Sequence, residues 1–445
     1  MSVATEDRPS EDQENSQKSD SVQDNKSAQD GSPTNSDGEK AEQPTEEPEA
    51  ATFSAIHEIA FIFMICMAQF LALAGLAQSI APLGIIGRSF GVTDEGELSW
   101  YPAAFSLTVG TFILPAGRLK NMIFALFGAA APTGWVVGAV FSSIFAQLAW
   151  WPWGYWVLAF VCVGMIPLAY LIIPADETHP VSVRDFDFLG CVTGVSGLIL
   201  FNFAWNQAAV VGWPTVYTYV LLIGGLLLLA AFAIVETRFS EHPLVPLNGF
   251  KGEAALALGV IAAGWGSFGI WVFYLWRFIE NVRGYSTLSA CAQNSPVAIT
   301  GLCAAVATGF LLSNIKVSYV LLLSTLFFLI GQILIATAPV GQIYWAQTFV
   351  SIIIMPWGMD MSFPSGTIVL SNNTPRHDQG IASSLVNTTV NYSISLALGI
   401  AGTVVRNINP SGTDTLAGYR GAWYLGIGLD GLAVLIALYF VWKFR

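Results

Sequence analysis

Two carboxylates lie inside long apolar stretches of the sequence, where a charge is costly. Near the middle of a bilayer a carboxylate costs ~3 kcal/mol or more, so it persists mainly where it faces a cavity or a partner. Asp360 is flanked by Trp357, Gly358 and Ser362. It could load and unload a proton, as proton-coupled exchange requires, or it could hold helices together through hydrogen bonds. Asp430, in "GIGLDGLAV", is interpreted as packing against a polar group of a neighbouring helix.

Amide side chains could complete a polar lining around Asp360. Asn387 and Asn391 are four residues apart, so both lie on one face of a helix. With Gln293 they could share a polar lining with Asp360, and Gln78 is a candidate for substrate contact. The alternative for all four amides is hydrogen bonding between helices.

The remaining reactive side chains indicate neither an enzyme nor a metal site. The five cysteines lie in apolar runs without metal-ligand spacing, and the four histidines are far apart in the sequence. The sequence has no P-loop, no nucleophile elbow and no pair of catalytic carboxylates. We therefore expect no catalytic residues, no metal and no cofactor. Arg277 and Glu280, at the end of one apolar run, could pair at three-residue spacing, but surface anchoring is the favoured interpretation.

The composition indicates a membrane protein with an acidic N-terminal tail. Hydrophobic residues make up 54% of the 445 residues and charged residues 11%, whereas a soluble domain has roughly a quarter charged residues. Residues 1–52 are rich in Ser, Asp, Glu and Gln and are predicted to be a disordered cytoplasmic tail.

Apolar runs long enough to cross a bilayer of ~30 Å predict twelve helices. Arginine and lysine are more frequent in the loops on one side, nine against five, which places both termini in the cytoplasm. "WWPWGYW" would then form an aromatic belt at the outer interface. The predicted spans are 59–82, 100–119, 121–145, 152–173, 188–207, 215–235, 253–276, 292–312, 317–337, 343–371, 380–405 and 421–443.

Five passages resemble the major facilitator superfamily. The likeness is to its fungal fourteen-helix drug:proton antiporter branch, in the form of the aminotriazole-resistance and low-affinity ammonium-facilitator members. The sequence departs from many such antiporters at Leu73 and Ala74, where they have an acid. The passages include "LAGLAQSIAPLGIIGRSFG" with "ELSWYPAAFSLTVGTFILPAGRL", "GAAAPTGWVVGAV", "ETRFSEHPLVPLNGF", "GIWVFYLWRFIENVRGYSTLSACAQNSPVAITG", and "WGMDMSFPSGTIVLSN" with "QGIASSLVNTTVNYSISLALGIAGTV".

The resemblance implies that two helices are missing where Leu119 joins Lys120. In the family a basic signature and core helices 3 and 4, roughly 60–80 residues by their usual lengths, stand between these positions. Losing two crossings together keeps every later segment on its original side. The implied division is an incomplete N-terminal half over 53–175, an inserted helix pair and link over 176–252, and a six-helix half over 253–445.

The resemblance also implies a function. The chain is expected to be a multidrug-resistance-like transporter in the plasma membrane, exporting or facilitating a small solute or xenobiotic. Its expected partners are that solute, protons and lipid. No nucleic acid is expected, and the chain is expected to be a monomer. The alternatives are a transport-inactive truncated paralogue, splice form or gene-model artefact, and a receptor on a transporter scaffold. Close packing and alternating access are assigned to Gly128, Pro132, Gly134 and Gly138.

Overall fold

Long helices form where the sequence is apolar, because a backbone surrounded by lipid must satisfy its hydrogen bonds within each segment. The computed structural model describes residues 55–116, 124–172, 187–240, 243–245, 252–374 and 379–444. The acidic tail and the Leu119–Lys120 junction lie outside these residues. The long helices of the described part are α1 (Ala55–Ile80), α3 (Glu95–Ala116), α4 (Phe124–Leu148), α5 (Pro152–Ile172), α6 (Phe188–Val211), α7 (Val216–Ile234), α8 (Gly252–Arg277), α10 (Pro296–Asn314), α11 (Val317–Ala336), α12 (Gln347–Asn372), α13 (Gln379–Ile408) and α14 (Thr415–Lys443).

Each of the twelve predicted spans overlaps one of these helices, and the all-α polytopic membrane fold is confirmed. By length and apolar composition, ten segments of the described part could cross a membrane. The two long helices that do not meet these criteria are more polar. Glu95 and Glu97 lie in the first turn of α3, and α12 contains an aspartate and several hydroxyl residues.

Short elements and helix ends depart from the predicted spans. The predicted spans contain no separate element for α2 (Leu83–Phe90), α9 (Thr287–Asn294) or the π-helical turns η2 (Val235–Phe239) and η3 (Phe278–Val282). Helix α14 begins at Thr415, before the apolar run, because Asp414 accepts a hydrogen bond from the backbone N–H of Ala417 at 3.0 Å. Such a side-chain cap satisfies a backbone donor that the first turn leaves without a partner.

Helix contacts among α1–α5 repeat those among α8–α14, and these two sets of helices are called here the first half and the second half. Helix α1 packs along α4 and against α5, as α8 packs along α13 and against α14. Between the halves, α3 packs along α13 and α10 packs along α4. In this scheme α1, α3, α4 and α5 correspond to α8, α10, α13 and α14. Helices α11 and α12 have no counterpart among the described residues of the first half.

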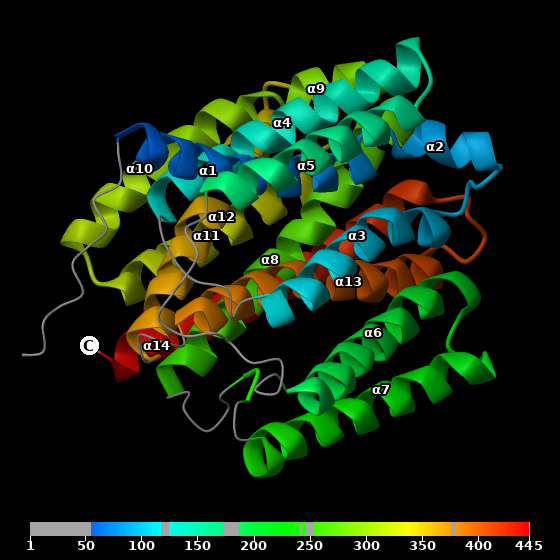
Figure 1. Cartoon of the computed structure of the whole chain (residues 1–445). Coiled ribbons are helices and arrows are strands. Elements are labelled where there is room, and N and C mark those ends of the chain that lie inside the picture. The colour runs from blue at the N-terminus through cyan, green and yellow to red at the C-terminus, as the bar shows by residue number, and fades with distance from the viewer. Residues whose placement is uncertain are drawn as a thin grey trace, which may run out of the picture. The chain divides into compact units, whose positions relative to one another are not determined.

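Helices α6 and α7 pack against each other, and α6 also contacts α3 and α13, which belong to different halves (Figure 1). A buried polar junction joins these three helices. The Ser395 hydroxyl of α13 donates to the carbonyl oxygen of Ala103 on α3 at 2.7 Å. It also lies 2.9 Å from the Asn202 amide oxygen on α6, and the Asn206 side-chain nitrogen donates to the Ser395 carbonyl at 3.2 Å.

Helix α8 is the most buried of the candidate spans. It contacts α11, α12, α13 and α14. Its aromatic side chains Trp265, Phe268 and Trp271 belong to the main hydrophobic core. The interior of the second half is therefore built around α8.

Candidate functional site

A cavity of about 230 Å³ lies at the centre of the bundle and is lined by α1, α3, α4, α8, α10, α12 and α13. These seven helices come from both halves. The lining is mostly apolar, and its polar members include Asp360, Gln69, Asn387 and Asn391. An apolar pocket with a few polar groups is the usual form of a small-molecule site.

Asp360 is placed at this cavity by a loosened stretch of α12. Pro356 and Pro364 stand four residues before and after it. Because proline has no backbone N–H, Pro364 cannot donate the usual helical hydrogen bond to the Asp360 carbonyl. The side-chain oxygen Oδ2 has no hydrogen-bond partner among the described residues. It lies 3.2 Å from the position that a Cβ on Gly301 of α10 would occupy.

Four aromatic side chains of α8 and α4 form part of the cavity wall. Trp265, Phe268 and Trp271 of α8 and Trp135 of α4 line it. Hydrogen bonds to α12 fix two of the indoles. Trp265 Nε1 donates to the Ser362 hydroxyl at 3.0 Å, and Trp271 Nε1 donates to the Ser351 hydroxyl at 2.8 Å. With their N–H groups engaged, these rings are held as rigid apolar surface.

Asn387 and Asn391 of α13 both line the cavity, but each side-chain nitrogen donates to its own helix. Asn391 Nδ2 reaches the Asn387 carbonyl at 3.0 Å, and Asn387 Nδ2 reaches the Ser383 carbonyl at 3.3 Å. Backbone of α3 lies very close here, since a Cβ on Gly110 would be 3.0 Å from Asn391 Cβ. The amides are therefore fixed on the wall near α3.

Gln293 and Gln78 are not among the residues that line the cavity. Both are buried, and neither side-chain oxygen has a hydrogen-bond partner among the described residues. Gln293 lies in the short helix α9, which ends before the main span α10 begins at Pro296. The expected shared lining with Asp360 therefore does not include Gln293. Gln78 lies in the last turn of α1, beyond the lining positions of that helix.

Asp430 lies on α14, outside the cavity lining, and is buried. The Ser267 hydroxyl of α8 donates to its Oδ2 at 2.7 Å. This contact agrees with the interpretation of Asp430 as packing against a polar group of a neighbouring helix.

The glycines of α4 sit where this helix meets α1. A Cβ on Gly134 would be 2.3 Å from the Phe70 carbonyl oxygen, and one on Gly138 would be 2.5 Å from the Cα and carbonyl oxygen of Ala74. Pro132 lines the cavity and contacts α10, since a Cβ on Gly301 would lie 2.4 Å from its ring. Gly128 lies in α4, but its surroundings are outside the described residues.

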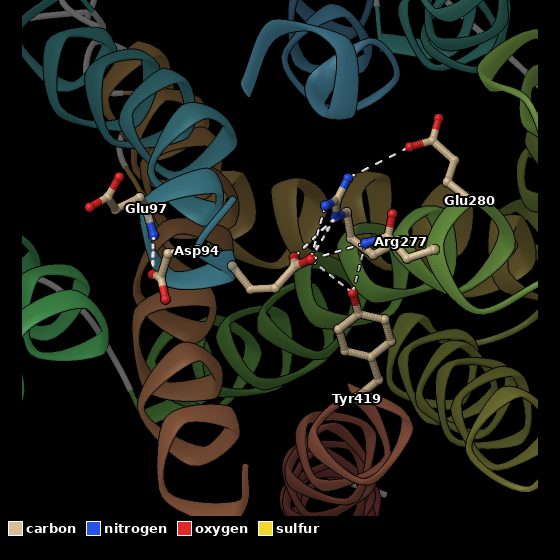
Figure 2. A network of polar contacts seen from close by, with 7 residues as sticks. Asp94, Glu97, Arg277, Glu280 and Tyr419 are labelled. Carbon is tan, nitrogen blue, oxygen red and sulfur yellow. Dashed lines mark hydrogen bonds and ion pairs between the residues drawn. The ribbon is translucent and has the colours of Figure 1, made fainter. Parts of the chain in front are cut away.

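A polar cluster closes the bundle at the end where α3 and α14 begin and α8 ends, called here the α2 end (Figure 2). Arg277 donates from Nε and Nη2 to Glu95 of α3 at 3.0 and 2.9 Å. Asn281 Nδ2 and the Tyr419 hydroxyl also donate to Glu95, at 3.0 and 2.9 Å. The interpretation of Arg277 and Glu280 as surface anchors is wrong, because Arg277 is 4% exposed. Sequence spacing could not pair Arg277 with a glutamate 182 residues away.

Comparisons with known proteins agree with this architecture. Residues 120–399 match the family model described as Major Facilitator Superfamily. The chain is 48% identical to the low affinity ammonium transporter of Saccharomyces cerevisiae, over 88% of this chain and 90% of that protein. It is 40% identical to the efflux pump terJ of Aspergillus terreus, over 86% and 88%. It is 34% identical to the aminotriazole resistance protein of Saccharomyces cerevisiae, over 88% and 85%.

A solved POT family transporter in complex with a thioalcohol-conjugated peptide has a similar fold. Its TM-score is 0.54 at 12% identity, and the match covers 86% of this chain and 95% of that one. The alignment to the ammonium transporter also contains positions that have no residue in this chain. It runs over 462 positions, whereas 88% of the 445 residues is about 392, so about 70 aligned positions have no residue in this chain.

Proposed function

The chain belongs to the Major Facilitator Superfamily, and we propose that it is a multidrug-resistance-like transporter that moves a small solute or xenobiotic through the central cavity. The cavity supports this proposal because residues of both halves line it. The relatives named for efflux, aminotriazole resistance and ammonium transport support the same class.

Proton coupling through Asp360 is the second part of the proposal. The observation that carries it is a cavity-lining carboxylate whose Oδ2 has no hydrogen-bond partner among the described residues. A carboxyl group at such a place can exchange a proton with a substrate or with water in the cavity. Asp430 also has one oxygen, Oδ1, without a partner among the described residues, but it does not line the cavity and its Oδ2 accepts a hydrogen bond from Ser267.

Asp360→Asn should abolish uptake of radiolabelled aminotriazole driven by a pH gradient in proteoliposomes. Asp430→Asn is the matched control: it also neutralises an aspartate in a long helix of the second half, and it should retain uptake. Protein amount in the vesicles and the melting midpoint are compared for both variants. Unchanged uptake by Asp360→Asn refutes the proton role.

The organisation of the chain is also part of this proposal. We assign residues 53–175 to an incomplete first half, 176–252 to the inserted pair and its link, and 253–445 to the second half. Both termini are assigned to the cytoplasm, on the arginine and lysine count, and the chain to the plasma membrane as a monomer. Gly134 and Gly138 would hold α4 close against α1, so that the two helices move together as the halves rock during alternating access.

A transport-inactive truncated form is the second candidate. Two observations favour it: the alignment gap of about 70 positions, and the absence of counterparts to α11 and α12 from the described first half. Both support the loss of two helices, which we assign to the Leu119–Lys120 junction. Sequencing transcripts across these two codons tests it. An additional in-frame segment would restore the complete transporter, whereas its absence would make the short chain the form to assay.

A further inference from the structure

Arg277 lies between two carboxylates that hold it in different ways (Figure 2). Its contact with Glu95 joins the second half to the first, through two hydrogen bonds of 2.9 and 3.0 Å. Its contact with Glu280 stays within the second half, and Nη1 lies 3.6 Å from Oε2. Nη1 has no hydrogen-bond partner among the described residues. The guanidinium is thus fully engaged on one side and only loosely paired on the other.

Burial makes a second partner necessary if the halves separate at this end. The side chains of Arg277 and Glu280 are 5% and 9% exposed. Removing one partner of a buried ion pair leaves an uncompensated charge, which is strongly unfavourable. Glu280 is three residues after Arg277, about one helical turn, so it moves with α8 and η3 when α3 moves away with Glu95.

We propose that Arg277 is a two-position switch: Glu95 holds it while the α2 end is closed, and Glu280 takes it over when that end opens. The inference rests on the proposed transport function, in which the cavity must open to each side in turn. On α3 the cavity is lined by Val109 and Ile113, in the last part of that helix, so Glu95 in its first turn lies away from the cavity.

Two further side chains belong to the closed position. Tyr419 of α14 and Asn281 of η3 both donate to Oε1 of Glu95, and Asn281 also bonds the Tyr419 hydroxyl at 3.1 Å. Both donors belong to the second half, so all of these hydrogen bonds to Glu95 must break when the two halves separate at this end. Glu280 has a charged neighbour in the first half, Arg88 of α2, since a Cβ on Gly84 would lie 3.3 Å from Glu280 Oε2 and 3.5 Å from Arg88 Nη1.

A native thiol can report the opening. Cys291 of α9 is 3% exposed and lies between the halves: its Sγ is 2.9 Å from the Ser143 hydroxyl of α4 and 3.4 Å from the Ala139 carbonyl. The full chain, with its other four cysteines replaced by alanine, is placed in lipid nanodiscs. Alkylation of Cys291 by N-ethylmaleimide is then followed by mass spectrometry, without substrate or pH gradient.

The two carboxylates should act in opposite directions. Glu95→Gln should raise the alkylation rate about tenfold, because losing a charge-assisted hydrogen bond from one of two states shifts their ratio by about that factor. Glu280→Gln should lower the rate below that of the parent. Glu97→Gln, on the exposed face of the same turn of α3, should leave it unchanged.

Tyr419→Phe removes one donor to Glu95 without changing any charge and should give a smaller rise, which keeps the test valid if Glu95→Gln does not fold. Two results overturn the inference: an unchanged or lower rate in both Glu95→Gln and Tyr419→Phe, or an unchanged or higher rate in Glu280→Gln. Because no transport is measured, failure of the proposed function in vesicles would be distinguishable from failure of the switch.

Discussion

Replacing Gly138 by alanine should destabilise the bundle, because the structure leaves no room for a methyl group there. The added Cβ would lie 2.5 Å from the Cα and the carbonyl oxygen of Ala74. These are backbone atoms of α1, so a whole helix must shift rather than one side chain. Overpacking of this kind typically costs about 1–3 kcal/mol, and the better helix propensity of alanine offsets about 1 kcal/mol of it. We expect a net loss of about 2 kcal/mol at most in the free energy of unfolding.

Gly164→Ala on α5 is the matched control, because a Cβ there has no atom within 4 Å. Both variants are purified in the same detergent, and their thermal unfolding midpoints are compared with that of the parent. Gly138→Ala should unfold a few degrees lower, whereas Gly164→Ala should unfold at the same temperature or slightly higher. Equal midpoints for the two variants would refute the close approach of α4 to α1.

Three other predictions concern single contacts. Trp265→Phe and Ser362→Ala should each lower the free energy of unfolding by about 1 kcal/mol, and the double variant by less than their sum, because both break one hydrogen bond; strict additivity in thermal melts would disprove the coupling. Burial raises the pKa of Tyr344 from 10.0 to about 12. The neutral side chain therefore stabilises the folded state fully below pH 10, and this stabilisation is lost as the pH rises from 10 to 12. Tyr344→Phe should flatten the melting midpoint over that interval, and an unaltered pH profile would contradict this. Asp187→Ala should cost about 1 kcal/mol in urea unfolding, since it removes the N-terminal cap of α6; no loss would mean that the cap is dispensable.

The helices could be predicted from the sequence because lipid imposes length and apolarity on each span. The short helices α2 and α9 could not be predicted in this way, since eight residues are too few to cross a bilayer. The start of α14 depends on the cap at Asp414, which an apolar count does not register. Helix existence was therefore readable from the sequence, whereas exact ends and short connecting helices were not.

The candidate site could be predicted only in part. Apolar context singled out Asp360 and Asp430, and four-residue spacing placed Asn387 and Asn391 on one face. Gln293 shows the limit, because a break before α10 puts it in a different element from the span assumed. The partnership of Arg277 with Glu95 depends on how α3 and α8 meet in space, which no local spacing encodes.

The junction of Ser395 with Asn202, Asn206 and the Ala103 carbonyl fixes one side of the contact between the two halves. It ties α3, α13 and the flanking α6 together through buried hydrogen bonds, and these are expensive to break without water. The two halves also meet at α4 and α10, where Pro132 packs against Gly301 in an apolar contact. In the proposed transport cycle, the contact between α4 and α10 should therefore open more easily than the junction of α3 with α13.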